Sequence, residues 1–75
     1  MDNTTKVKTF GVYLTQVREN SGYSQGKLAK RLGVATSSVS RWETGQTYPD
    51  RVQLINLLSV FPDRKDKLVS LWLTN

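Results

Sequence analysis

Glycine and proline residues divide this chain into short segments, and each segment carries apolar residues at helical spacing. The first segment has the i, i+3, i+4, i+7 pattern of an amphipathic helix, formed by Phe10, Tyr13, Leu14 and Val17. Gly22 is placed to end this helix in a left-handed cap. Strand signals are weak, because alternation with a period of two never lasts four residues between turns. The sequence therefore predicts an all-α protein.

Two short helices are predicted on either side of Gly33. Ser24 suits the N-cap of the first, whose buried stripe is Leu28, Ala29 and Leu32. The second covers roughly residues 36–43, and Gly45 closes it. Because Gly33 has no Cβ, it allows a positive φ in a tight turn. Residues 24–43 are thus expected to form a helix-turn-helix, whose second helix can enter the DNA major groove.

Two further helices complete the expected fold. Asp50 and Gln53 read as a capping box that begins the fourth helix. The inner face of that helix is expected to consist of Val52, Ile55, Leu58 and Phe61. Pro62 breaks it, and Asp63 can cap a C-terminal helix over residues 63–73. The predicted architecture is a compact bundle of five short helices.

Composition excludes several classes of protein. The 75 residues are expected to form one domain, residues 1–75, in which residues 1–6 are disordered. No cysteine or histidine is present, which removes disulfides, thiolate metal sites and the commonest general base. The six carboxylates are scattered over helix caps and ends, so no enzyme activity, metal or cofactor is expected. No apolar run is long enough to span a membrane, and a cytoplasmic location is the simplest expectation.

The positive charge is concentrated in one part of the chain. The net charge is +5, and no carboxylate lies between Glu19 and Glu43. That gap holds four cations, Lys27, Lys30, Arg31 and Arg41. Such a surface attracts polyanions, although an ordinary solvated basic face has the same composition.

The stretch YSQGKLAKRLGVATSSVSRWETGQTYP, residues 23–49, resembles the lambda repressor-like, Cro-type helix-turn-helix domain, also called the xenobiotic-response-element type. The resemblance covers roughly residues 10–60. Its matching elements are Gly11, Leu14, Val17, Arg18, Ser24-Gln25, Leu28-Ala29, Leu32-Gly33-Val34, Val39-Ser40, Trp42-Glu43, Gly45 and Pro49. The resemblance implies double-stranded DNA as the partner.

The resemblance places four side chains at base-facing positions, namely Thr36, Ser37, Ser40 and Arg41. Short hydroxyl side chains let a helix sit deep in the groove, where they can donate to or accept from several bases. Arg41 can grip guanine O6 and N7 bidentately or hold a phosphate instead. Ala35 stands where relatives have a capping residue, so either Thr36 takes over the cap and leaves base reading, or the cap is lost.

A second set of residues is expected to contact the phosphate backbone. In the family, the counterpart of Gln25 meets a phosphate, and a helix N-terminus favours an anion there. Further candidates are expected to line the DNA backbone past the recognition helix and are Ser38, Thr44, Gly45 and Thr47. Two interpretations of Arg51 are equally supported: a solvated arginine on the fourth helix, or a contact with the narrow groove or a phosphate. Gly26 weakens the second helix, or allows a phosphate to approach closely.

Arg18 and Glu43 match family positions that pair between the first helix and the end of the third. A carboxylate at a helix C-terminus is opposed by the dipole, so Glu43 needs a partner. Bidentate geometry with Arg18 would brace the recognition helix. We expect a structural ion pair here.

These observations favour a sequence-specific, double-stranded DNA-binding transcriptional regulator, of the phage, plasmid or bacterial repressor type. Leu71 or Leu73 can remain outside the core, and the apolar remnant is either a homodimer contact on a two-fold operator or an edge of the monomer core. The alternative is a protein-interaction module, such as an antitoxin-like partner, or the N-terminal DNA-binding domain of a larger regulator.

Overall fold

The computed structural model describes residues 9–74, and every regular element in that range is helical. The elements are α1 (Phe10–Asn20), α2 (Gln25–Leu32), α3 (Thr36–Thr44), α4 (Arg51–Val60), the 3₁₀ turn η2 (Pro62–Arg64) and α5 (Lys65–Thr74). The all-α, five-helix fold predicted from the sequence is confirmed. The predicted disorder of residues 1–6 lies outside the described residues.

Three side chains cap helix N-termini as their residue types predict. Thr9, Ser24 and Asp50 each accept a hydrogen bond from the backbone N–H three residues later, at 3.2, 3.1 and 2.8 Å. The Gln53 side chain completes a capping box by accepting from the Asp50 backbone N–H at 2.9 Å. These bonds satisfy donors that have no partner within the helix, and they fix where α1, α2 and α4 begin.

The C-terminal helix begins later than we expected. Instead of a helix over 63–73 capped by Asp63, the chain forms the 3₁₀ turn and then α5, which starts at Lys65. Pro62 occupies the first position of the turn, where its missing N–H is not needed and its φ already suits a helix. Asp63 therefore lies inside the 3₁₀ turn, which begins at Pro62, and it does not precede a helix as a cap.

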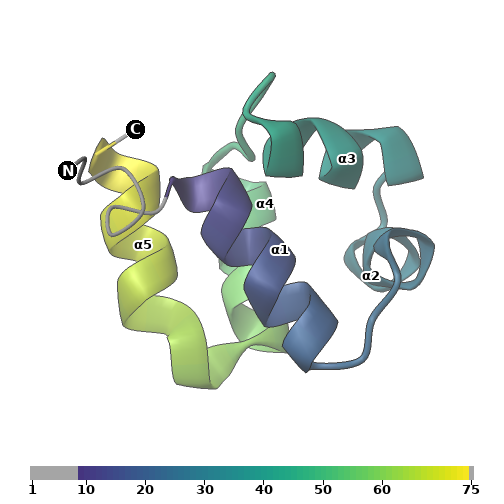
Figure 1. Cartoon of the computed structure of the whole chain (residues 1–75), viewed down its shortest axis with the longest axis horizontal. Coiled ribbons are helices and arrows are strands. Elements are labelled where there is room, and N and C mark those ends of the chain that lie inside the picture. The colour runs from purple at the N-terminus through teal and green to yellow at the C-terminus, as the bar shows by residue number, and fades with distance from the viewer. Residues whose placement is uncertain (1–8, 75) are drawn as a thin grey trace, which may run out of the picture.

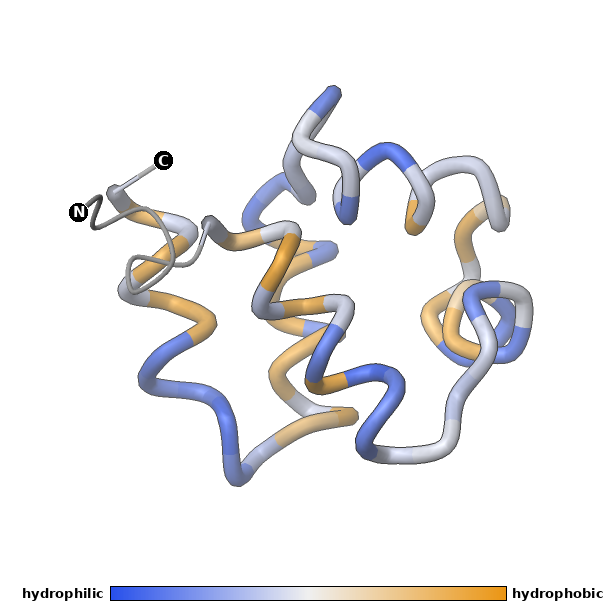
Figure 2. Tube along the Cα trace, in the orientation of Figure 1, coloured by the Kyte–Doolittle hydropathy of each residue, from blue (hydrophilic) through white to orange (hydrophobic). Residues whose placement is uncertain are grey.

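Helix α5 lies beside α1 and also contacts α4, α3 lies across the end of α1, and α2 is seen nearly end-on beside α3 (Figure 1). Their shared core consists of Phe10, Leu14, Val17, Leu28, Ala29, Val39, Trp42, Leu54, Leu57, Phe61 and Leu68. The trace of α3 is mostly white and blue apart from short apolar arcs (Figure 2). One face of α3 therefore holds it to the bundle, and the rest is polar.

Helix α1 touches α3 through backbone at Gly11. A Cβ on Gly11 would lie 2.5 Å from the carbonyl oxygen of Glu43 and 2.6 Å from that of Trp42. Real Cβ atoms do not approach oxygen so closely, so the crossing of α1 and the end of α3 requires glycine at this position.

Helix α4 turns a different face to the core than we expected. Leu54 and Leu57 are buried, whereas Val52 and Ile55 are 66% and 57% exposed, so that prediction was wrong. Of the expected inner face, only Phe61 is buried and Leu58 half-buried. Apolar residues occur on nearly every side of α4, so periodicity does not fix its rotation, and contacts with α2 and α5 decide it.

Candidate nucleic-acid interface

The turn between α2 and α3 is held by glycine geometry and two backbone hydrogen bonds. Gly33 has a φ of 74°, in the left-handed region that disfavours residues with a Cβ. Its N–H donates to the Lys30 carbonyl at 3.2 Å, and the Val34 N–H donates to the Ala29 carbonyl at 3.0 Å. These bonds satisfy the last carbonyls of α2 and direct the chain into α3 at a fixed angle.

The inner face of α3 anchors it in the core. Val39 is fully buried, and Trp42, one turn later, is 2% exposed. Burial of two such side chains contributes about 1.5–3 kcal/mol each relative to exposure. Helix α3 therefore has a fixed rotation, which determines the side chains that it presents outward.

The outward face of α3 carries the four side chains predicted to read bases. Ser37 and Arg41 are exposed one turn apart, with Ser40 half-buried beside them and Thr36 exposed at the start of the helix. Within the described residues 9–74, none of these four side chains makes a hydrogen bond or ion pair. Their polar groups are therefore available to a ligand.

The start of α3 resolves the choice between the two roles of Thr36. The N-cap residue is Ala35, no side chain caps the helix, and Thr36 is the first helical residue. The Ser38 N–H donates to the Ala35 carbonyl at 2.9 Å, as in an ordinary first turn. The side-chain cap is therefore lost, and Thr36 does not act as the N-cap of α3.

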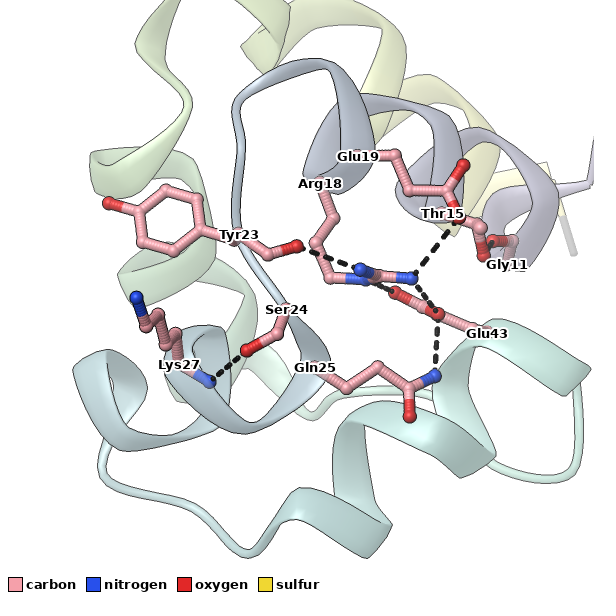
Figure 3. A network of polar contacts seen from close by, with 9 residues as sticks. All are labelled: Gly11, Thr15, Arg18, Glu19, Tyr23, Ser24, Gln25, Lys27 and Glu43. Carbon is pink, nitrogen blue, oxygen red and sulfur yellow. Dashed lines mark hydrogen bonds and ion pairs between the residues drawn. The ribbon is translucent and has the colours of Figure 1, made fainter.

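The other end of α3 is held by a network of charged hydrogen bonds (Figure 3). Arg18 Nε lies 2.6 Å from Glu43 Oε2, and Arg18 Nη2 lies 3.2 Å from Glu43 Oε1. Arg18 Nη1 also donates to the Tyr23 carbonyl at 2.8 Å. The hydrogen bonds that Arg18 donates to the Glu43 carboxylate raise the pKa of Arg18 above its ordinary value. The two side chains are 10% and 5% exposed, so the pair ties α1 to the end of α3 in a largely water-free position.

Gln25 belongs to the same network, which sequence reasoning missed. Its Nε2 donates to Glu43 Oε1 at 2.8 Å and joins the first residue of α2 to the end of α3. The two residues are far apart in the sequence, and no local pattern marks the contact. An amide nitrogen carries two hydrogens, so Gln25 keeps one donor for a phosphate. Its predicted phosphate contact stays a prediction.

The remaining phosphate candidates lie between the first turn of α3 and the first residue of α4. Thr44 and Thr47 are exposed, Ser38 is half-buried, and Gly45 ends the helix with a φ of 82°. The Thr44 hydroxyl donates to the Arg41 carbonyl at 3.3 Å, which leaves its oxygen free to accept. Arg51 is exposed at the first position of α4. Every candidate therefore lies on α3, on the connection that follows it or at the start of α4.

Comparison with known proteins decides the family. A family model described as a helix-turn-helix domain matches residues 9–61. This chain belongs to the helix-turn-helix family. The match confirms the assignment made from residues 23–49, and the lambda repressor-like resemblance is consistent with it.

The helix-turn-helix domain is also similar to a characterised protein. It is 33% identical over 61 residues to the HTH-type transcriptional activator BcrR of Enterococcus faecalis. The alignment covers 81% of this chain and 30% of that protein, so the chain spans about a third of its relative's length. No solved structure matches the chain.

Charge on the helix-turn-helix domain is one-sided around α2 and α3. Lys27, Lys30, Arg31 and Arg41 are all exposed. Glu43 is the one carboxylate between residues 20 and 49, and Arg18 neutralises it. Residues 9–74 contain no cluster of three metal-ligating side chains and no helix long and apolar enough to cross a membrane. The exposed charges of residues 20–49 are therefore all positive, and the exposed carboxylates Glu19 and Asp50 lie just outside this stretch.

Proposed function

We propose that this helix-turn-helix domain binds double-stranded DNA in a sequence-specific manner and regulates transcription, with α3 in the major groove. The observation that supports this most directly is the outward face of α3. Its four polar side chains have no partner within the described residues, and the exposed charges of residues 20–49 are positive. Thr36, Ser37, Ser40 and Arg41 would contact base edges.

In the same proposal, a second set of residues contacts the phosphate backbone of the DNA. These residues are Gln25, Ser38, Thr44, Gly45, Thr47 and Arg51. These contacts would set register and orientation, while the base contacts select sequence. The simplest regulatory outcome is repression by occupancy, because a domain bound across a promoter blocks polymerase without any further activity. Such a regulator would work in the cytoplasm, on the nucleoid.

Selection of binding sites from random duplex DNA tests this proposal. A consensus sequence supports it, and enrichment of no sequence contradicts it. A palindromic consensus would also support a homodimer, for which Leu73, 69% exposed on α5, offers an apolar contact. If each domain contacts three to five phosphates, a plot of the logarithm of the binding constant against the logarithm of the salt concentration should have a slope of about −3 to −4.5. We call this the log–log salt slope.

Arg41→Ala distinguishes base reading from phosphate binding. Loss of a bidentate guanine contact should weaken binding by about 1–3 kcal/mol and relax preference at one base pair. Arg51→Ala is the comparison for an arginine that contacts phosphate, so it should weaken binding to all sequences about equally. A uniform loss over all sequences with Arg41→Ala would assign Arg41 to phosphate.

A second candidate function is the DNA-binding part of a larger regulator. The chain spans about a third of a relative whose name describes a transcriptional activator, and this observation favours it. The face of α3 argues against a module that binds only proteins, since it presents hydroxyls and an arginine rather than large apolar side chains. A reporter gene under the selected site separates activation from repression.

A further inference from the structure

Trp72 connects the C-terminal helix to the loop that follows α3. Its indole Nε1 donates to the carbonyl oxygen of Pro49 at 2.8 Å, across 23 residues of sequence. The family match ends at residue 61, before α5 begins, so this contact is not part of the matched region. Trp72 is half-buried, and its N–H reaches a loop that leads directly into α4.

The loop over residues 45–50 is fixed at two ends and exposed between them. At its start, the Gln46 N–H donates to the Arg41 carbonyl at 2.9 Å. At its far end, the Pro49 side chain is fully buried, and the Tyr48 ring packs edge-on against Phe10 at 6.1 Å. The loop projects from the edge of the molecule on which α3 lies (Figure 1).

The Pro49 carbonyl has no role in the helix that follows. The first turn of α4 uses the Asp50 carbonyl, which accepts from the Leu54 N–H at 2.8 Å. The Asp50 side chain caps the same turn. Trp72 is thus the donor that the structure gives to the Pro49 carbonyl, and loss of the indole N–H leaves that oxygen without its partner.

We propose that Trp72 is a positioning residue for DNA binding, which holds the 45–50 loop in the geometry that its phosphate contacts require. The inference rests on the proposed function. Gly45 and Thr47 lie between the Arg41 and Trp72 anchors, and Arg51 follows directly after them. Contacts of this kind tolerate displacements of only about 0.5 Å, so a loop that keeps the buried Pro49 side chain but loses its hydrogen bond to Trp72 shifts enough to weaken them while α3 stays in place.

Trp72→Phe tests the proposal because it keeps an aromatic ring and removes the donor. Chemical synthesis of the 75-residue chain allows a sharper variant, in which benzothiophene replaces the indole of Trp72 alone and keeps its shape without the N–H. Val60→Ala is the control, since Val60 is half-buried at the opposite end of α4 from the loop. All variants are compared at temperatures where each is fully folded.

Both Trp72 variants should bind the selected duplex about three- to tenfold more weakly than the wild type. Their log–log salt slope should be shallower by about one, because Arg51, the cation that follows the loop, loses its phosphate, and the consensus sequence should be unchanged. Amide resonances of residues 45–48, 50 and 51 should shift, and those of residues 36–41 should not; Pro49 has no amide proton. The Val60→Ala protein should lose stability but keep the wild-type affinity and slope.

Two results overturn the inference. If the wild type binds duplex DNA and the Trp72 variants match its affinity and salt slope, the positioning role is wrong and the proposed function stands. If the wild type binds no duplex at low salt, the proposed function fails and this inference fails with it.

Discussion

Glu43→Ala removes the centre of the network that holds the end of α3. The substitution deletes both hydrogen bonds from Arg18 and the bond from Gln25. It leaves the Arg18 guanidinium in place with its side chain 10% exposed. The remaining polar contacts of Arg18 are its bond to the Tyr23 carbonyl at 2.8 Å and the Glu19 carboxylate at 3.7 Å.

The size of the effect follows from what the guanidinium retains. Breaking a buried ion pair by removing one partner costs about 3–5 kcal/mol, because the other charge is left uncompensated. Arg18 keeps the Tyr23 carbonyl and can turn toward exposed Glu19, which reduces the loss. We therefore expect the free energy of unfolding to fall by about 2–4 kcal/mol. For a domain of this size, that lowers the melting temperature by about 10–25 °C.

Thermal and urea unfolding followed by circular dichroism measure this loss. Glu19→Ala is the control, because Glu19 is a neighbour of Arg18 whose side chain is 64% exposed. Its effect should stay below about 1 kcal/mol, as for other surface pairs. A Glu43→Ala protein that loses less than about 1 kcal/mol would refute the bracing role. DNA affinity lost at unchanged stability would show that Glu43 acts on the ligand instead.

Three further predictions concern the backbone around α2 and α3. Gly11→Ala should lower the free energy of unfolding, measured in urea, by about 2 kcal/mol, because the new Cβ would lie 2.5 Å from the Glu43 carbonyl oxygen. Wild-type stability of this variant would contradict the close crossing of α1 and α3. Ala35→Ser should raise the melting temperature, since a capping serine contributes about 1 kcal/mol, and no gain would mean that α3 already satisfies its first N–H groups otherwise. Gly26→Ala should stabilise by up to about 1 kcal/mol, since the nearest atom to the new Cβ is Thr36 Oγ1 at 3.7 Å, and a measured loss would reveal crowding.

The elements whose ends carry local signals could be predicted from the sequence. Ser24 and the Asp50–Gln53 box form the caps that their residue types indicate. Gly33 and Gly45 adopt the left-handed φ that lets α2 and α3 end where the apolar pattern ends. These signals depend on residues a few positions apart, so a pattern along the chain is enough to find them.

The features that depend on distant residues could not be predicted. Helix α4 is apolar on most sides, so only packing against α2 and α5 decides that Leu54 rather than Ile55 is buried. The Gln25–Glu43 and Trp72–Pro49 hydrogen bonds join residues 18 and 23 positions apart. Neither bond has a local signature, because its two partners lie far apart in the sequence. Both bonds nonetheless lie at the ends of segments that the proposed interface uses.

Helix α3 has a composition that disfavours a helix, and the network at its end compensates for this. Five of its nine residues have short hydroxyl side chains that cost about 0.5 kcal/mol each in a helix, namely Thr36, Ser37, Ser38, Ser40 and Thr44. The helix also lacks a side-chain cap. A helix this short and this poor in helix formers does not persist by its own propensity. It persists because Val39 and Trp42 bury its inner face and because Glu43 is held from two other helices. Because the buried inner face and the Glu43 network hold α3 in place, its outer face does not have to stabilise the fold. The side chains of that face can therefore be suited to binding a ligand.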